Sequence, residues 1–123
     1  MRAAIDIGSN TVHLLVGEIK ENKVSVVLQV VRTTRLGEGC KNKMLLPVSM
    51  DRTVNALVDF QQILQEYGIE KCPKIVATSA IREAKNAGVL LEKILERTNW
   101  PVKLISGEEE AMLSYQGATS LLS

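Results

Sequence analysis

The chain has 123 residues, of which 46% are hydrophobic and 24% charged, as in a globular domain with its own core. A net charge of +1 and an aromatic content of 3% disfavour nucleic-acid binding, which needs a basic patch or stacking platforms. No apolar run approaches the ~18 residues of a membrane span, and there is no signal-peptide pattern. Cys40 and Cys72 form no CxxC pair and are expected to be reduced thiols. We therefore expect a cytoplasmic protein that binds neither nucleic acid nor membrane.

Apolar periodicity predicts three strands, followed by alternating helices and strands. The predicted strands are residues 2–8, 11–20, 24–32, 74–78 and 102–105, and the predicted helices are 50–67, 79–85, 88–97 and 106 onwards. The first three strands should form an antiparallel meander, with Asn22 at positive φ in a hairpin turn. The order βββαβαβα predicts an α/β domain with a mixed sheet.

The helix over residues 50–67 has a clear apolar stripe and clear end signals. Ser49 is the predicted N-cap and Gly68 the predicted left-handed stop. The stripe consists of Met50, Val54, Leu57, Leu64 and Tyr67. In the helix over residues 88–97, the residues expected to point inward are Leu90, Leu91, Ile94 and Leu95. Residues 33–47 are expected to form a loop.

Asp6 is a carboxylate near the end of a strand that is otherwise apolar. Burying a carboxylate is costly unless it is paired, hydrogen-bonded or bound to a metal. Asp6 could hold, through water, a Mg²⁺ ion carried by a phosphate substrate. It could equally form an Asx-turn that fixes the hairpin.

Gly8, Ser9 and Asn10 form the turn that follows this strand. Successive N–H groups in such a turn can form an anion-binding nest, and Gly8 would let a ligand approach the backbone closely. A hairpin turn that simply needs small polar residues explains the same sequence.

Residues 78–82 lie where a predicted strand ends and a helix begins, which is where ligands of α/β sheets gather. The first N–H groups of a helix favour anions, and Arg82 could grip a phosphate with two hydrogen bonds. Alternatively, Arg82 pairs with a surface carboxylate such as Glu83 or Glu66.

Three carboxylates are adjacent in the segment Ser106-Gly107-Glu108-Glu109-Glu110. Ser106 and Glu109 have the spacing of a capping box, so Glu109 needs no catalytic role. Glu108 and Glu110 exceed what capping requires. A helix places adjacent residues about 100° apart, so at most one or two of the three carboxylates face any given cleft.

Two further side chains have simple structural explanations. His13 is expected to be a structural histidine with a satisfied ring. Arg35, in the segment Arg35-Leu36-Gly37-Glu38-Gly39, could approach an anion, but a surface loop arginine is the simpler interpretation.

Four segments together resemble the exopolyphosphatase and guanosine-pentaphosphate phosphohydrolase family, a branch of the superfamily that includes actin, Hsp70 and sugar kinases. They are residues 6–11, 33–39, 77–86 and 105–111, in family order and at family spacing. The resemblance implies a ribonuclease H-like fold for the α/β domain. It also implies a hydrolase that releases terminal phosphate from polyphosphate or guanosine pentaphosphate with Mg²⁺.

The resemblance also implies a role for each motif. Gly8, Ser9 and Asn10 would form the first phosphate loop, and Arg82 would line the phosphate channel. Glu110 would be the general base that activates or orients a water molecule, and Asp6 would contact the metal.

The family has a second phosphate loop of the type Asp-Ile-Gly-Gly-Gly-Ser and a second lobe, and neither occurs in these 123 residues. We therefore expect residues 1–123 to be an N-terminal lobe with negligible turnover alone. We expect the apolar face of its last helix, residues 111–122, to find a partner in a homodimer.

Two other functions fit the same motifs. One is a non-catalytic module that binds polyphosphate or an alarmone nucleotide, in which Glu110→Gln would change no rate. The other is a lobe of an actin-like ATPase or sugar kinase, which would transfer phosphate from ATP to an acceptor.

Overall fold

The computed structural model describes residues 1–39, 42–77 and 79–104. In chain order its elements are β1 (Arg2–Ile7), β2 (Thr11–Lys20), β3 (Lys23–Thr33), α1 (Pro47–Glu66), β4 (Lys74–Ala77), α2 (Ser79–Arg82), α3 (Ala87–Thr98) and β5 (Lys103–Leu104). None of the described helices is both long and apolar enough to cross a membrane.

The strands form one mixed sheet in the order β3-β2-β1-β4-β5. β1, β2 and β3 pair antiparallel, while β4 pairs parallel with both β1 and β5. The predicted meander and mixed α/β sheet are therefore confirmed. The hairpin turn between β2 and β3 has Glu21 and Asn22 at positive φ, so the prediction for Asn22 is also confirmed.

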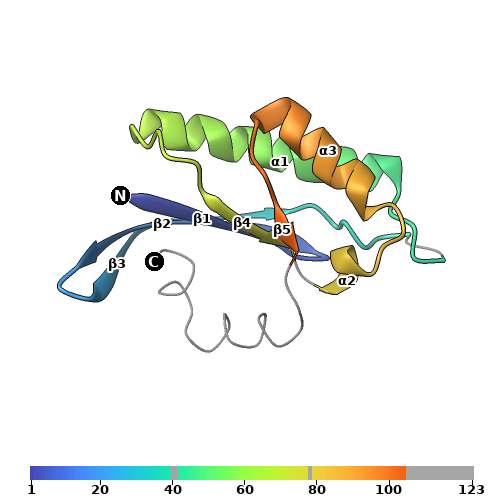
Figure 1. Ribbon diagram of the computed structural model, residues 1–123, viewed down its shortest axis with the longest axis horizontal. Helices are drawn as coiled ribbons and strands as arrows, with labels where there is room; N and C mark the ends of the chain where they lie inside the picture. Colours follow the sequence, from blue (N-terminus) through green and yellow to red (C-terminus); the bar gives the residue numbers. More distant parts are fainter. Residues whose placement is uncertain (40–41, 78, 105–123) are drawn as a thin grey trace.

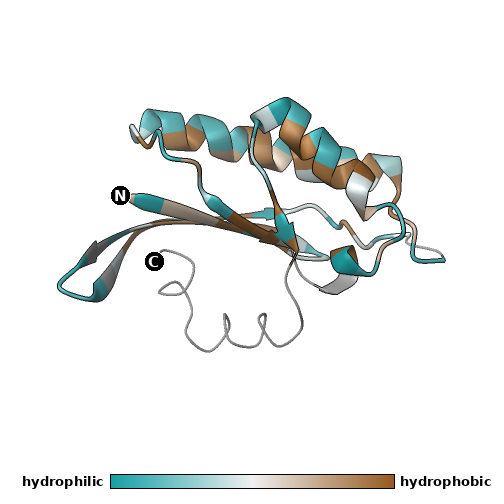
Figure 2. Cartoon of the chain, in the orientation of Figure 1, coloured by the Kyte–Doolittle hydropathy of each residue, from teal (hydrophilic) through white to brown (hydrophobic). Residues whose placement is uncertain are grey.

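The hydrophobic core lies between the sheet and two helices. Figure 1 shows α1 and α3 lying over the same face of the sheet, and the two helices pack against each other. Side chains alternate between the two faces of a strand, so Ile5 and Ile7 both enter this core. They share this core with Leu57 and Phe60 of α1, and all four side chains are fully buried. Figure 2 shows hydrophobic residues along the strands and recurring along both helices, whereas the β2–β3 turn is hydrophilic.

The predicted stripe of α1 is largely correct, but both of its ends need correction. Ser49 is not the N-cap: the helix begins at Pro47 with Leu46 as N-cap, and Ser49 is buried within the first turn. Proline fits the first helical turn because its missing N–H would have no partner there. Tyr67 is exposed at the C-cap, and Gly68 at φ +71° ends the helix as predicted.

The two later helices also differ from their predictions. In α3, Leu90 and Ile94 are buried but Leu95 is 48% exposed, because the helix is covered on one side only and Leu95 lies about 100° from Ile94. α2 ends at Arg82 rather than at residue 85. The N–H of Lys85 donates to the carbonyl of Lys43 (2.7 Å), so it is not available to extend the helix.

The carboxyl ends of the parallel strands meet at one edge of the sheet. Ile7 of β1 is in register with Ala77 of β4, and Ala77 with Leu104 of β5. The turn after β1 and the start of α2 therefore leave the sheet side by side. This edge is where ligands bind in open α/β sheets, and we call it the carboxyl edge.

Candidate functional site

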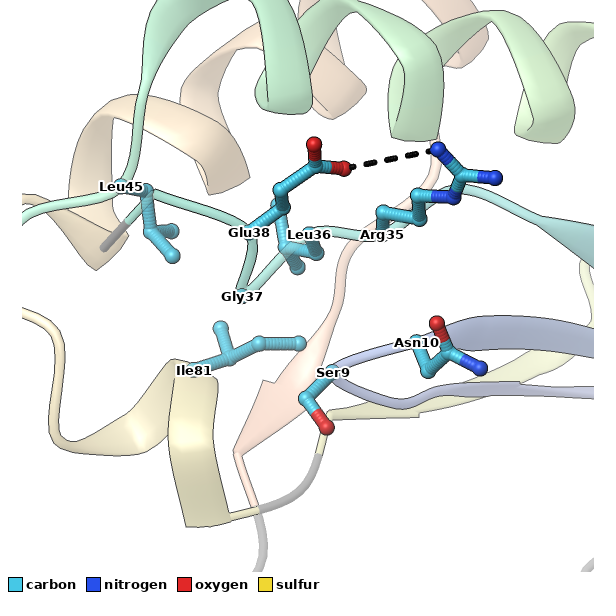
Figure 3. Close-up of a pocket in the computed structure, with 8 residues that line it drawn as sticks. All are labelled: Ser9, Asn10, Arg35, Leu36, Gly37, Glu38, Leu45 and Ile81. Carbon is cyan, nitrogen blue, oxygen red and sulfur yellow. Dashed lines mark ion pairs between the residues drawn. The ribbon is translucent and has the colours of Figure 1, made fainter.

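A cleft of about 580 Å³ opens at the carboxyl edge (Figure 3). It is formed by the turn after β1, the loop between β3 and α1, and α2. Its lining residues are Ser9, Asn10, Arg35, Leu36, Gly37, Glu38, Leu45 and Ile81. Ser9 and Asn10 were predicted to bind phosphate from the sequence, and Arg35 was considered only as a weak candidate.

The turn after β1 is held mainly through its carbonyl groups. The carbonyl of Ser9 accepts a hydrogen bond from the N–H of Gly37 (2.8 Å). The carbonyl of Asn10 accepts two, from the N–H groups of Thr34 and Arg35 (3.0 Å each). The backbone oxygens of Ser9 and Asn10 therefore point towards the loop between β3 and α1.

This arrangement leaves N–H groups of the turn available to a ligand. In a trans peptide the carbonyl of one residue and the N–H of the next point in opposite directions, and the chain has no cis peptide in its described part. The N–H of Asn10 consequently points away from Gly37. Neither Ser9 nor Asn10 donates a backbone hydrogen bond to any residue that the structure describes. Two adjacent unpaired donors are what an anion-binding nest requires.

Gly8 is required by close packing rather than by an unusual φ. Its N–H donates to the carbonyl of Thr11 (3.0 Å), and a Cβ at this position would lie 3.1 Å from that same oxygen. A larger residue would therefore require the Thr11 carbonyl, which holds the Gly8 N–H, to shift by a few tenths of an ångström. The structure gives Gly8 this local role, in addition to the close ligand approach predicted from the sequence.

The loop between β3 and α1 is held from α1 by Arg52. The Nε of Arg52 donates to the carbonyl of Thr34 (2.8 Å), and its terminal nitrogen donates to the carbonyl of Arg35 (3.3 Å). The same nitrogen lies 3.2 Å from Ser49 Oγ and 3.5 Å from the Glu38 carboxylate. Figure 3 shows the Arg35 and Glu38 side chains extending from the loop towards α1, joined by an ion pair.

A second clamp holds the far end of this loop. The side chain of Asn86 accepts a hydrogen bond from the N–H of Leu45 (2.8 Å) and donates one to its carbonyl (2.9 Å). Asn86 lies just before α3, so this clamp ties the loop to the second helix of the core.

Arg82 is the last residue of α2 and follows Ile81, which lines the cleft, but Arg82 itself is not among the lining residues. It is exposed and makes no ion pair with Glu83 or Glu66, so the alternative that it pairs with either carboxylate is not supported. Ile81 is fully buried and faces Ser9 in Figure 3. The packing of Ile81 anchors α2 and leaves the neighbouring Arg82 guanidinium in solvent.

Asp6 lies within β1, opposite His13 on β2 and Val76 on β4. Its Oδ1 atom is buried, and its position in the strand places it on the sheet face opposite Ile5 and Ile7. His13 is exposed, with its Nε2 3.0 Å from Thr11 Oγ1. Glu110 lies outside the described residues, so its predicted role remains a prediction.

The described part of the chain contains no group of three or more His, Cys, Asp or Glu side chains that could hold a metal. A single carboxylate, Asp6, nevertheless fits Mg²⁺ in its usual enzymatic form, in which one or two carboxylates and substrate phosphates complete the coordination.

Sequence reasoning missed Arg52 and Asn86, which shape the cleft from other elements. Arg52 reads as an ordinary polar residue on an amphipathic helix, and Asn86 as a loop residue. Near the cleft, the sequence signals a tight turn through the two glycines that follow Arg35, Gly37 and Gly39. In the structure Arg35 adopts φ +50°, as one of six residues other than glycine with positive φ in the described part of the chain. A left-handed residue other than glycine often marks a constrained site.

Comparison with known proteins places this geometry in a family. The family model described as the Ppx/GppA phosphatase family matches residues 15–123. The bifunctional 3-dehydroquinate synthase/phosphatase of Fusobacterium nucleatum is 32% identical over 127 residues, which cover 98% of this chain and 19% of that protein.

Two similar crystal structures carry the same fold. The Aquifex aeolicus member of the Ppx/GppA family is 36% identical with a TM-score of 0.85, covering 97% of this chain and 39% of that one. An exopolyphosphatase from Cytophaga hutchinsonii is 31% identical with a TM-score of 0.86, covering 94% and 37%. The chain thus spans 19% of the curated relative and under two fifths of these structures. The ribonuclease H-like α/β fold is confirmed, and the chain belongs to the Ppx/GppA phosphatase family.

Proposed function

We propose that this chain forms the first half of the phosphate site of a hydrolase that releases terminal phosphate from inorganic polyphosphate or guanosine pentaphosphate. The observation that carries the proposal is the turn after β1. The carbonyls of Ser9 and Asn10 accept hydrogen bonds from the loop between β3 and α1, and the N–H groups of the same two residues make no backbone hydrogen bond within the described residues. Family membership supports phosphate as the anion that they receive.

The binding residues have distinct roles in this proposal. The N–H groups of Ser9 and Asn10 and the Ser9 hydroxyl hold phosphate oxygens, and Gly8 keeps the turn tight. Arg82 adds a cation with a planar fork that matches two phosphate oxygens. A chain of phosphates presents the same group repeatedly, so a site built from backbone donors and an arginine suits a polyanion.

Glu110 is the proposed general base, which orients or deprotonates the attacking water. Asp6 would hold Mg²⁺ through water, and the ion when bound would screen the charge on the phosphate oxygens. The protein residues lower the barrier chiefly by positioning the phosphate and stabilising its charge.

The test is phosphate release from polyphosphate by the full-length protein with Mg²⁺. We expect Glu110→Gln to lower kcat at least ~100-fold with binding retained, since general base catalysis contributes about that much. Glu96→Gln, at an exposed position on α3, is the matched control and should leave kcat unchanged.

Three outcomes would reject parts of the proposal. Equal rates for Glu110→Gln and the unsubstituted protein would favour a binding module. Transfer of phosphate from ATP to an acceptor would favour a kinase. Release of phosphate from neither substrate would reject the hydrolase. Residues 1–123 alone should show negligible release, because they lack a second phosphate loop.

A further inference from the structure

We infer that Arg52 is a positioning residue that sets the direction of the anion-binding N–H groups in the turn after β1. The inference rests on the proposed function of that turn and goes beyond it, because Arg52 lies on α1 and lines neither the cleft nor the turn.

Two loop residues connect Arg52 to the turn. Thr34 and Arg35 each donate their N–H to the carbonyl of Asn10, and each offers its own carbonyl to the Arg52 guanidinium. Every link in this bridge is a hydrogen bond to backbone. The position of Arg52 is thereby transmitted directly to the peptide plane between Asn10 and Thr11. It reaches the plane between Ser9 and Asn10 through the same loop, because the N–H of Gly37, two residues after Arg35, holds the carbonyl of Ser9.

The bridge needs an external anchor because its conformation is unfavourable by itself. Arg35 adopts φ +50°, a left-handed conformation that places Cβ close to the following carbonyl. Thr34 is buried, so its carbonyl cannot rely on water as a partner. The planar guanidinium satisfies both carbonyls at once, and Ser49 Oγ accepts a further hydrogen bond from it.

Arg52 is also fixed at its own base. It belongs to the second turn of α1, whose neighbouring residues Met50, Thr53 and Val54 are buried against the core. The exposed Glu38 carboxylate adds a pair at 3.5 Å that contributes little by itself. The helix-bound end of the bridge is therefore held by a rigid element of the fold.

Without Arg52, the carbonyls of Thr34 and Arg35 would turn towards solvent. The peptide plane between Ser9 and Asn10 would then lose its fixed direction, because Gly37 and the loop that hold it would move. Anion affinity should fall even though every phosphate-contacting group is still present.

The experiment compares Arg52→Ala, Arg52→Lys and Lys93→Ala in the full-length protein. Lys93→Ala is the matched control, because it also removes one positive charge and one ion pair with α1. The Lys93 amino group lies 3.4 Å from the Asp51 carboxylate and makes no hydrogen bond or ion pair with the described part of the loop between β3 and α1. Affinity for tripolyphosphate is measured by calorimetry without Mg²⁺, well below each melting temperature. Hydrogen exchange is followed in peptides that contain residues 34–38.

We expect Arg52→Ala to weaken tripolyphosphate binding about tenfold and to speed exchange at the N–H groups of Thr34, Arg35 and Gly37. Arg52→Lys keeps the positive charge but loses the planar guanidinium that reaches both carbonyls, so its affinity for tripolyphosphate should fall about threefold. Lys93→Ala should remain within about twofold of the unsubstituted protein.

Affinity within twofold for Arg52→Ala, or unchanged exchange in residues 34–38, would overturn the inference. If Arg52→Ala does not fold, full retention of affinity by Arg52→Lys would overturn it instead. Failure of the proposed function has a different signature, because the unsubstituted protein itself would then not bind tripolyphosphate. Exchange at Thr34, Arg35 and Gly37 would still decide whether Arg52 holds the turn.

Discussion

The helix-covered face of the sheet and its carboxyl edge are stabilised in different ways. On the face, apolar side chains such as Ile5, Leu57 and Phe60 are fully buried, and packing dominates. At the edge, backbone groups of a turn and a loop are satisfied by one another and by Arg52 and Asn86. Apolar packing depends weakly on the orientation of the groups in contact, whereas a hydrogen bond fixes the orientation of its donor and acceptor. The face therefore supplies stability, and the edge supplies a defined arrangement of donors.

The largest expected effect is on the face. Phe60→Ala should lower the free energy of unfolding by about 3–5 kcal/mol, because it removes a fully buried aromatic ring and leaves a cavity. Urea unfolding measures this. Val48→Ala, at a 56% exposed position on the same helix, is the control and should change stability by less than about 0.5 kcal/mol.

Below its melting temperature, Phe60→Ala should bind tripolyphosphate as tightly as the unsubstituted protein. A loss of affinity in step with the loss of stability would show that face and edge are not separable.

The next largest effect is at the far end of the edge loop. Asn86→Ala removes both hydrogen bonds to Leu45 and should cost about 2 kcal/mol, since it leaves two backbone groups without partners. The comparison is Asn55→Ala at an exposed position of α1, measured by the same urea unfolding. Equal costs for the two substitutions would mean that the clamp contributes nothing.

The smallest expected effect has the opposite sign. Thr34 is buried, and its Oγ1 has no hydrogen-bond partner among the residues that the structure describes. Thr34→Val replaces this hydroxyl with a methyl group of similar shape, so it should raise the free energy of unfolding by about 1 kcal/mol. Thermal unfolding would show a higher Tm. A lower Tm would reveal a polar partner for Thr34 in solution.

The same contrast explains what the sequence could predict. The residues that build the helix-covered face recur at the spacing of a strand or a helix. The strands, the meander and most of the α1 stripe can therefore be predicted from the spacing of apolar residues alone. Leu95 and Tyr67 were misplaced because periodicity does not show how wide an arc of each helix is covered. The edge depends on partners far apart in the chain, such as Asn86 with Leu45.

The sequence motifs predicted residues of the candidate site but not the residues that hold its backbone in place. Ser9, Asn10 and Arg82 were predicted from turn chemistry and helix starts. Ser9 and Asn10 line the cleft, whereas Arg82 is exposed at the end of α2 and is not among the lining residues. Phosphate binding by these residues stays a prediction. Arg52 carries no local signal, because an arginine on the polar side of a helix is ordinary. Its role becomes visible only when the carbonyls of Thr34 and Arg35 are seen to face it.

The central claim is that the turn after β1 receives phosphate through the N–H groups of Ser9 and Asn10. The most direct test is a titration of the ¹⁵N-labelled full-length protein with tripolyphosphate, followed by NMR. We predict saturable shifts of the Ser9 and Asn10 amide signals, with the β2–β3 hairpin amides unchanged. Saturable binding that leaves these two signals unmoved would contradict the account.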